Sequence, residues 1–424
     1  MRIIEAMESN VRGYVRSFPA VFKSAKGAQL TDASGTEYLD FFAGAGTLNY
    51  GHNNEKISKA LIEYLQNDGI VHGLDMATLA KTEFMQKFKD VILEPRNLEY
   101  KMQFTGPTGT NSVETALKLA RMIKGRSNIV AFTNAYHGLT MGSLGVTGNS
   151  FYRDEAHISR CNVSFMPFEN YYGNDIDTLK IFRKHLEDPS SGLDSSAAVI
   201  VETVQAEGGI HAASPEWLKG LEEICREFDM LLIIDDIQVG NGRTGDFFSF
   251  EEAGITPDMV TLSKSIGGGL PLAILLFRPE LDQWKPGEHT GTFRGNNLAF
   301  VASTQALSYW ENDDLSKAVK YKSKILKDRL EKISLETAGY STDVRGRGMI
   351  YGLEFCEPGF ASEISMKCFE KGLVIELAGA DDQVVKFLPP LTIAEEELLE
   401  GLDIFEEAVK ELVQEKENRL HEAF

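Results

Sequence analysis

Cysteine is scarce in the sequence, and its spacing excludes two classes of protein. Four cysteines in 424 residues neither form a CxxC pair nor reach the density of a secreted disulfide scaffold, so we expect reduced thiols. Free cysteines are usually small buried apolar residues. We therefore expect buried positions for Cys161, Cys225, Cys356 and Cys368.

Long apolar runs are absent as well. No stretch approaches the ~20 consecutive apolar residues of a membrane span, and the N-terminal MRIIEAMESNVRGYVRSF carries charges every few residues instead of an apolar signal core. The sequence contains no internal repeat and no low-complexity segment. These absences predict a cytoplasmic protein that has no membrane partner.

Positive charge is in deficit. Lys and Arg total 43 against 63 Asp and Glu, which gives a formal net charge of −20. Such a surface repels nucleic acid and anionic membranes, so we expect neither as a partner. The acidity fits two explanations equally well, a device for solubility in a salty cytoplasm or background composition.

The composition that remains is that of an ordinary globular protein with a long chain. Hydrophobic residues make up 43% of the sequence and charged residues 25%, which excludes collagen-like and disordered classes. Typical domains hold ~100 to 200 residues, so this length predicts two or three packed units.

Short β-branched or apolar runs recur between polar or turn residues, and each predicts a strand buried on both faces. Helical patterns separate many of these runs. In SPEWLKGLEEICREF, Ser214 is the expected N-cap, and NSVETALKLARMIK has one apolar face at helical spacing. Alternating strands and helices predict an α/β fold with a largely parallel sheet. The expected strands are KMQFT at Lys101, NIVAFT at Asn128, NVSFM at Asn162, AAVIVE at Ala197, MLLIID at Met230, DMVTL at Asp258 and LAILLF at Leu272.

The residue pattern changes after about Trp310, where long charged helical patterns and a few strand-like runs begin. These indicate a second, smaller α+β unit. The first fifty residues carry hairpin signals such as an Asp-Ala-Ser-Gly turn, and we expect them to pack with the C-terminal unit because termini often lie close together. We predict an N-terminal segment (1–50), a large domain (51–310) and a small C-terminal domain (311–424).

Lys264 stands in TLSKSIGGGLPL, between a short apolar run and three consecutive glycines. Most lysines in such places are solvated loop residues. Here the glycines let a planar ligand approach closely, and Asp235 ends the run LLIID at the carboxyl edge of the sheet, where open α/β folds bind ligands. A pyridoxal phosphate site needs these two groups, a lysine that binds the cofactor as an imine and an aspartate that keeps its ring nitrogen protonated.

Ordered motifs extend along nearly the whole chain. They are GTEYLDF, LNYGHNN, FTGPTGTNSVETALKLAR, YHG, VIVETVQAEGG, IIDDIQVGNGRTG, TLSKSIGGGLPL, HTGTFRGNNLAF, VRGRGMIYGLEF and FLPPLTI. Together they resemble the class III aminotransferases of the ornithine and 4-aminobutyrate type. The resemblance implies pyridoxal 5′-phosphate as cofactor and the type I pyridoxal phosphate (aspartate aminotransferase-like) fold, a large domain with a mostly parallel sheet and a smaller α+β domain.

The resemblance also implies roles for the residues around Lys264. It makes Lys264 the cofactor-binding lysine, Asp235 the partner of the pyridinium nitrogen, and Gln238 a hydrogen-bond donor near the phenolic oxygen. Tyr136 in AYHG matches the aromatic residue that stacks on the pyridine ring, although a tyrosine at an arbitrary strand end is more often a core residue. We expect His137 to brace this turn rather than to transfer protons.

The stretch GPTGT matches the phosphate-binding loop of the family. The amides of Gly109 and Thr110 at a helix N-terminus, helped by the Thr108 hydroxyl, would hold the phosphate because free N–H groups attract anions. The stretch lacks the GK[ST] ending of a nucleotide P-loop, which argues against an NTPase. Thr292 in GTFRGN matches a threonine that reaches the cofactor phosphate of a neighbouring subunit, so the resemblance implies a homodimer or a higher homo-oligomer.

Further charged residues near these motifs have two kinds of expected role. Glu202 and Glu207 in ETVQAEGG resemble acidic residues beside the cofactor and the substrate. For Arg243 and Asp236 we expect structural roles, because buried arginine and carboxylate groups are normally paired. We assign no metal ligands.

Two residues depart from the family pattern. Relatives usually have an arginine where VVKFLPPL has Lys386, and that arginine holds the substrate α-carboxylate as a two-point fork, whereas lysine offers only a point charge. Ornithine-type relatives also have an arginine for the side-chain carboxylate of glutamate where HGLT has Leu139. The dicarboxylate must be held differently here, and the sequence does not identify the residue that holds it.

Flanking stretches narrow the resemblance to members of ectoine biosynthesis. These stretches are MRIIEAMESNVRGYVRSFPAVF, GLDMAT, GPTGTN, DDIQVGNGRTGDFFSFEEAGI and KPGEHTGTFRGNNLAF. They imply transfer of the amino group of L-glutamate to L-aspartate 4-semialdehyde, which gives L-2,4-diaminobutyrate and 2-oxoglutarate. The alternatives are another ω-aminotransferase, acting on ornithine, acetylornithine or 4-aminobutyrate, and a noncatalytic oligomer that kept the fold.

Overall fold

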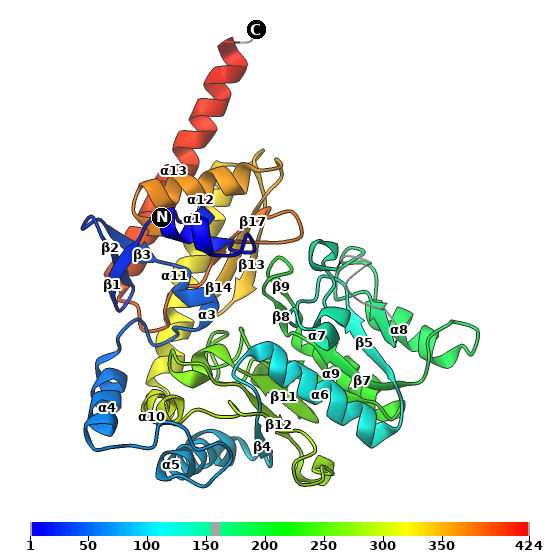
Figure 1. Cartoon of the computed structure of the whole chain (residues 1–424). Coiled ribbons are helices and arrows are strands. Elements are labelled where there is room, and N and C mark those ends of the chain that lie inside the picture. The colour runs from blue at the N-terminus through cyan, green and yellow to red at the C-terminus, as the bar shows by residue number, and fades with distance from the viewer. Residues whose placement is uncertain (1, 154–161, 423–424) are drawn as a thin grey trace.

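A seven-stranded sheet forms the centre of the molecule, which a computed structural model describes over residues 2–153 and 162–422 (Figure 1). All seven runs predicted as strands lie in this sheet. In spatial order the strands are β4 (Lys101–Phe104), β12 (Ile274–Phe277), β11 (Met259–Leu262), β10 (Leu231–Asp235), β7 (Ser196–Val201), β5 (Asn128–Phe132) and β6 (Val163–Met166).

The strand directions confirm an α/β fold with a mostly parallel sheet. Neighbouring strands from β11 to β6 run parallel, whereas β12 is antiparallel to both of its neighbours, β11 and β4. Burial on both faces holds for the five inner strands but is wrong for β4 and β6, which are partly exposed. These two are the edge strands, so each has a neighbour on one side only.

Helices cover both faces of the central sheet. On one face, α6 (Gly109–Lys124) buries its predicted apolar stripe against side chains such as Ile233. The other face, which includes Ile234, packs with α9 (Pro215–Glu227). The Ser214 hydroxyl oxygen accepts a hydrogen bond of 3.1 Å from the backbone N–H of Trp217, so the predicted N-cap of α9 is confirmed.

The N-terminal strands share a sheet with a strand from the C-terminal part of the chain. Strand β3 pairs in parallel with β15, and the two hairpin partners β1 and β2 continue the sheet outward. This pairing supports the predicted packing of the first fifty residues, while the domain boundaries themselves stay a prediction. The bounds are β1 (Phe22–Lys26), β2 (Gln29–Asp32), β3 (Glu37–Asp40) and β15 (Leu373–Val374).

A third sheet and the helices α11, α12 and α13 come from the C-terminal part of the chain, and α13 projects from the upper part of the molecule (Figure 1). The strands lie in the order β13 (Ser341–Arg347), β14 (Ile350–Phe355), β17 (Val384–Phe387) and β16 (Glu376–Ala378), and the helices are α11 (Asp314–Glu336), α12 (Phe360–Glu370) and α13 (Glu395–Glu422).

The remaining elements are mostly short. They are α1 (Arg2–Met7), α2 (Tyr14–Ser17), α3 (Ala43–Gly46), α4 (Glu55–Gln66), α5 (Leu79–Phe88), α7 (Met141–Gly145), α8 (Thr178–Glu187), α10 (Asn297–Ala306), a hairpin of β8 (Val204–Gln205) and β9 (His211–Ala212), a π-helix η1 (Lys89–Leu93) and the 3₁₀ helices η2 (Glu94–Arg96), η3 (Ser150–Tyr152), η4 (Glu251–Ala253), η5 (Lys264–Gly267), η6 (Pro279–Leu281) and η7 (Leu307–Trp310). Among the residues that the structure describes, every helix is too short or too polar to cross a membrane.

The cysteines follow the prediction in part. Cys225 and Cys368 are buried free thiols. The prediction is wrong for Cys356, which is exposed just after β14, where its thiol donates to the Tyr340 carbonyl oxygen at 3.2 Å. A residue that follows the end of a strand has left the packed sheet. Cys161 lies outside the described residues.

Arg243 joins three parts of the chain from a fully buried position. Its guanidinium donates to the carbonyl oxygens of Met349 at 2.9 Å and Pro389 at 2.5 Å, and to the side-chain oxygen of Asn49 at 2.6 Å. These three neutral oxygens fit the structural role that we expected for Arg243. Asp236 accepts a hydrogen bond from the backbone N–H of Ser249 at 3.1 Å, and burial raises its pKa to about 7.

Candidate active site

The carboxyl ends of β10 and β11 bring Asp235 and Lys264 to the same edge of the central sheet. Asp235 is the last residue of β10 and pairs in register with Thr261 of β11. Lys264 follows β11 after one intervening residue and begins η5. The two side chains predicted from the sequence therefore come from adjacent strands.

Asp235 is buried and held from three sides. Its Oδ2 atom lies 2.7 Å from Nδ1 of His137, and its Oδ1 atom accepts from the Thr261 hydroxyl and the Ile237 backbone N–H, both at 3.2 Å. The His137 side chain has no exposed surface. The imidazole thus contacts the carboxylate directly, in addition to standing in the turn that it was expected to brace.

The Lys264 side chain bonds to an unusual backbone segment. Its Nζ atom donates to the Ala45 carbonyl oxygen at 2.9 Å, and Nε2 of Gln238 donates to the same oxygen at 2.8 Å. Ala45 has a φ of 55°, in the left-handed region that non-glycine residues rarely adopt, so this turn is strained in order to direct its carbonyl toward the site. Burial lowers the pKa of Lys264, while the charge of Glu207 acts in the opposite direction.

The N-terminus of α6 lies beside the loop that follows Asp235. A Cβ atom on Gly109 would come within 2.9 Å of Cγ2 of Ile237, so the close approach of these two segments requires glycine. The Thr108 hydroxyl bonds to Oδ1 of Asn111 at 2.8 Å, and the hydroxyls of Thr110 and Thr140 lie 2.6 Å apart. The first amides of a helix have no acceptor within it, so this turn can hold an anion.

Tyr136 and Glu202 meet above the sheet edge. The Tyr136 backbone N–H donates to the Glu202 carboxylate at 2.9 Å. Burial and the nearby charge of Asp235 raise the pKa of Glu202 well above its ordinary value, so this carboxyl group favours the protonated form. The Tyr136 ring packs edge to face with Tyr152, with their centroids 5.6 Å apart.

Lys386 on β17 is fully buried between two carboxylates. Its Nζ atom lies 2.8 Å from Oε1 of Glu207 and 2.9 Å from Oε2 of Glu376, and the Tyr14 hydroxyl donates to the other oxygen of Glu376 at 2.7 Å. Burial lowers the pKa of Lys386, but the two carboxylates outweigh that effect and raise it. The lysine is therefore charged, and its charge is neutralised by the protein.

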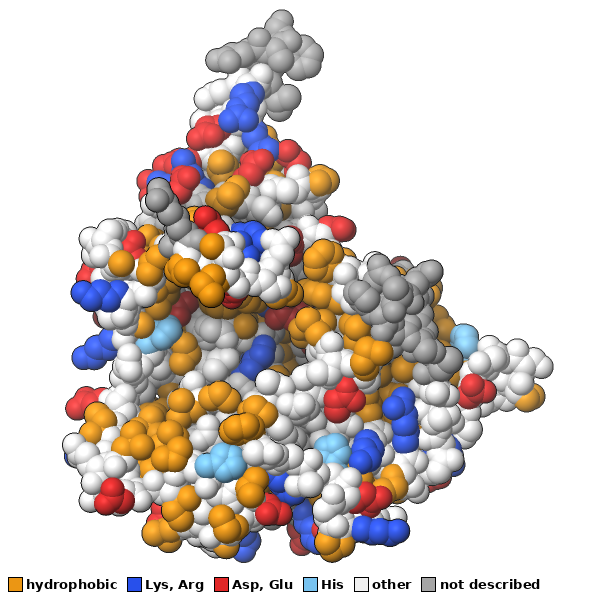
Figure 2. All heavy atoms as spheres, viewed as in Figure 1, with side chains coloured by type: hydrophobic (Ala, Val, Ile, Leu, Met, Phe, Trp, Pro, Cys, Tyr) orange, Lys and Arg blue, Asp and Glu red, His pale blue; other side chains and the backbone are white. Residues whose placement is uncertain are grey.

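A cavity of about 900 Å³ lies between the N-terminal segment and the loops around Tyr136 and β16. Its described lining includes Tyr136 and Glu207 but not Lys264 or Lys386. Figure 2 shows the molecule hollowed between its upper and lower parts. Glu207, Glu376, Leu139 and Arg12 all line the cavity, and Leu139 is half exposed.

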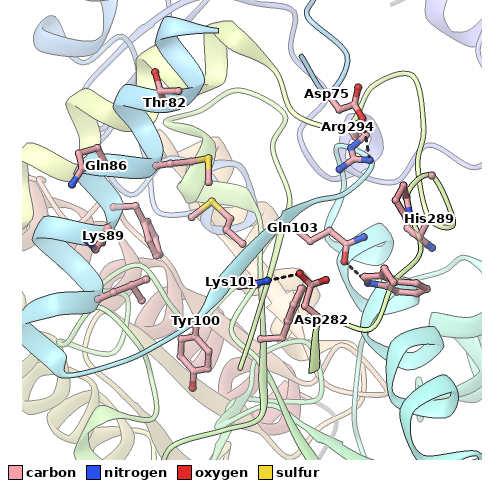
Figure 3. A pocket seen from close by; sticks show the side chains of 18 of the residues that line it. Asp75, Thr82, Gln86, Lys89, Tyr100, Lys101, Gln103, Asp282, His289 and Arg294 are labelled. Atoms are coloured by element: carbon pink, nitrogen blue, oxygen red, sulfur yellow. Dashed lines mark hydrogen bonds and ion pairs between the residues drawn. The ribbon is translucent and has the colours of Figure 1, made fainter. Parts of the chain in front are cut away.

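A second cavity, of about 910 Å³, runs along the edge strand β4 (Figure 3). Lys101 and Asp282 form an ion pair of 2.7 Å there, and the Trp284 ring N–H donates to the side chain of Gln103 at 3.0 Å. Its described lining contains none of the predicted site residues. Thr292 is exposed on the loop before α10 and lines neither of these two cavities.

Three contributors to the site were missed in the sequence. Glu376 stands in the strand-like VIEL, where an acid inside an apolar run was an available signal. Tyr14 could not be identified because its partner, Glu376, stands hundreds of positions away in the sequence. The Ala45 carbonyl could not be identified because its direction depends on an unusual backbone angle.

Comparison with known protein families gives a match over most of the chain. The family model described as Aminotransferase class-III matches residues 11–409. The diaminobutyrate–2-oxoglutarate transaminase of Wolinella succinogenes is 64% identical over 424 residues, which is 100% of this chain and 99% of the relative. The enzyme of the same name from Halalkalibacterium halodurans is 57% identical and covers 98% of each chain.

A solved structure shares the fold. The ornithine aminotransferase of Toxoplasma gondii, which was crystallised with PLP partly occupying its active site, superposes with a TM-score of 0.85 at 24% identity. The superposition covers 98% of this chain and 94% of the other.

Proposed function

Because the chain belongs to the class III aminotransferases, we propose that it transfers the amino group of L-glutamate to L-aspartate 4-semialdehyde, forming L-2,4-diaminobutyrate and 2-oxoglutarate. The observation that carries the chemistry is the Lys264 amine, which stands just after β11, the strand next to the one that Asp235 ends. The choice of substrates rests on full-length relatives of the same name at 57 to 64% identity.

The residues around Lys264 fit pyridoxal 5′-phosphate, the cofactor of the family. Gln238 lies beside the lysine with its Nε2 donor bonded to Ala45, and its buried Oε1 atom has no partner among the described residues, which leaves that oxygen able to accept a hydrogen bond from a ligand. Asp235 would hold the proton of the pyridine nitrogen, Tyr136 would stack on the ring, and the first turn of α6, residues 108–110, would hold the phosphate. Bound there, the cofactor supplies an electron-accepting ring that stabilises negative charge on the reacting carbon.

Lys264 performs the proton transfers in the proposed reaction. Its lowered pKa leaves more of the amine neutral at a given pH, and a neutral amine can remove the proton from Cα of glutamate. A positioned general base of this kind contributes about 10²- to 10⁴-fold to the rate. At the opposite end of the cofactor, Asp235 would keep the ring nitrogen protonated. His137 holds the Asp235 carboxylate in place.

Glu207 and Lys386 are the proposed substrate residues next to the reacting carbon. As long as Glu207 lies on Lys386, the lysine offers no free charge to a carboxylate. Glutamate carries a carboxylate on its reacting carbon, and the semialdehyde does not. Release of Glu207 from Lys386 would therefore favour binding of glutamate over binding of the semialdehyde. Burial raises the pKa of Glu202, whose carboxyl group accepts a hydrogen bond from the Tyr136 backbone N–H.

The active unit is proposed to be a homodimer. Leu74, Met76, Leu79 and Phe293 are all more than half exposed. Figure 2 shows hydrophobic side chains gathered on the lower left face, over α4 and α10. A second copy that covers this surface would bring its own Thr292 loop toward the site, as the family pattern implies.

The free thiols and the acidic composition support a cytoplasmic enzyme, and we propose a place for it in ectoine biosynthesis. A substrate panel tests this assignment. The absorbance spectrum of the holoenzyme should change with glutamate and recover with L-aspartate 4-semialdehyde. Faster recovery of the spectrum with glutamate semialdehyde or succinate semialdehyde would favour an ornithine- or 4-aminobutyrate-type enzyme. An absorbance spectrum that does not change when glutamate is added would indicate a noncatalytic protein.

A further inference from the structure

We propose that the Arg12 guanidinium binds the substrate carboxylate that lies three bonds from the reacting carbon. This proposal rests on the proposed function and identifies a specificity-determining residue for it. Arg12 stands in the N-terminal segment and lines the same cavity as Tyr136, Glu207 and Glu376.

The two proposed substrates share one carboxylate position. Glutamate reacts at C2 and carries its side-chain carboxylate at C5. The semialdehyde reacts at C4 and carries its carboxylate at C1. In each molecule three bonds separate the reacting carbon from this distal carboxylate, so one fixed cation can hold both substrates in turn.

The edge of Arg12 that recognises carboxylates is open. Its Nη1 atom donates to the carbonyl oxygens of Glu8 at 3.0 Å and Ser9 at 2.9 Å. The Nε and Nη2 atoms form the side edge of the guanidinium, which matches the two oxygens of a carboxylate. Among the described residues, the hydrogen bonds of the Arg12 guanidinium are those of Nη1, so Nε and Nη2 are open to a ligand.

Neighbouring contacts fix the position of Arg12. The Arg16 guanidinium bonds to the Arg12 carbonyl oxygen and to the carbonyl and side-chain oxygens of Asn10, the latter at 2.6 Å. Two residues beyond Arg12, the Tyr14 hydroxyl donates to Glu376 inside the site. The segment is thus tied at both ends, and Arg16 is committed to the loop while Arg12 is free for a ligand.

Other cations at this site are less suited to the distal carboxylate. Lys386 is fully buried and neutralised by two carboxylates. Leu139 has no charge, although relatives of the ornithine type have an arginine there. Among the described residues that line the cavity, the cationic side chains are those of Arg12 and Arg16. Arg12 therefore fills the role that the sequence left without a residue.

Amino-donor selectivity tests the proposal. L-glutamine has the length of L-glutamate but a neutral amide in place of the distal carboxylate. Arg12→Gln should lower the ratio of kcat/KM for glutamate to kcat/KM for glutamine about 10- to 100-fold, the loss expected for a charge-assisted hydrogen-bonded pair. Arg12→Lys should retain part of the ratio. Lys180→Gln, which removes an exposed cation on α8, should leave it unchanged.

Equilibrium binding gives a second readout without turnover. Glutarate and its monoamide, glutaramate, have no amino group to transfer, and calorimetry on the holoenzyme measures their affinities. Wild-type protein should prefer glutarate, and Arg12→Gln should lose that preference. A preference that survives Arg12→Gln, or that Lys180→Gln also removes, overturns the proposal. If the wild type fails to transaminate, the proposed function falls, and the glutarate comparison still decides for or against Arg12 as the carboxylate receptor.

Discussion

Nδ1 of His137 lies 2.7 Å from Oδ2 of Asp235, and neither side chain is open to solvent. An imidazole that donates to a buried carboxylate fixes the orientation of that carboxylate. Since Asp235 is the proposed partner of the ring nitrogen, His137 is a positioning residue that acts through it.

Replacement of His137 by Asn should lower kcat about 10-fold, because loss of one charge-assisted hydrogen bond costs about 1.5 kcal/mol at the low end of the usual range. KM for glutamate should change less than kcat, since His137 does not line the substrate cavity. The pH dependence of the cofactor absorbance should shift as well, which a purely structural role would not cause. His211→Asn in β9 is the matched control, and a wild-type kcat in His137→Asn would contradict the role.

Lys264→Ala should abolish turnover while the protein still folds. The side chain makes one described hydrogen bond, to the Ala45 carbonyl oxygen, so little packing is lost. Circular dichroism and thermal unfolding check the fold, and single-turnover absorbance with glutamate checks the chemistry. Transamination by a clean preparation of this variant would remove Lys264 from the mechanism.

Lys386→Met should destabilise the protein by about 3 kcal/mol at pH 8, because it leaves the buried Glu376 and the partly exposed Glu207 without their cation. The pKa of Glu376 is already raised by burial, so this carboxyl group takes up a proton as the pH falls. The loss of unfolding free energy in Lys386→Met should therefore be smaller at pH 5.5. Urea unfolding of wild type and variant at both pH values measures this loss. The double variant Lys386→Met/Glu376→Gln should recover stability at pH 8, and an equal loss at both pH values would contradict this account.

Lys322 on α11 should make stability rise with pH. The side chain donates to the carbonyl oxygens of Leu391 at 2.6 Å and Ile393 at 2.8 Å, and burial lowers its pKa to about 8 from 10.5. Between these values the unfolded chain binds the proton and the folded chain does not, so raising the pH favours folding. The contribution is about 1 to 2 kcal/mol after allowance for its partial exposure.

The difference in unfolding free energy between wild type and Lys322→Met isolates this contribution. It should grow in favour of the wild type from pH 7.5 to pH 10. A difference that stays constant over this range would show that the lysine does not titrate there.

Features that depend on neighbouring residues were predictable from the sequence. The runs that form the central sheet are apolar or β-branched over their own length, and the Ser214 cap depends on a backbone N–H three residues away. The positions of Asp235 and Lys264 could be predicted for a similar reason, since Asp235 ends one strand, Lys264 stands two residues after the next, and parallel strands end at the same edge.

Features that depend on distant contacts were not predictable. The antiparallel direction of β12 follows from a connection that passes around the Lys264 turn, and its apolar sequence would suit either direction. The acid in VIEL was visible, but its partner Lys386 stands on another strand. The partners of Arg243 could not be predicted either, because they include backbone carbonyl oxygens, which every residue has.

The pairing of β3 with β15 bears on the order in which the protein matures. About 330 residues separate the two strands along the chain, so a ribosome that adds roughly 5 to 20 residues per second needs tens of seconds between making one and making the other. During that time the nascent N-terminal hairpin has no edge to join. The polypeptide can assemble its central sheet first, and the segment that carries Arg12 reaches its place over the cavity only near the end of synthesis.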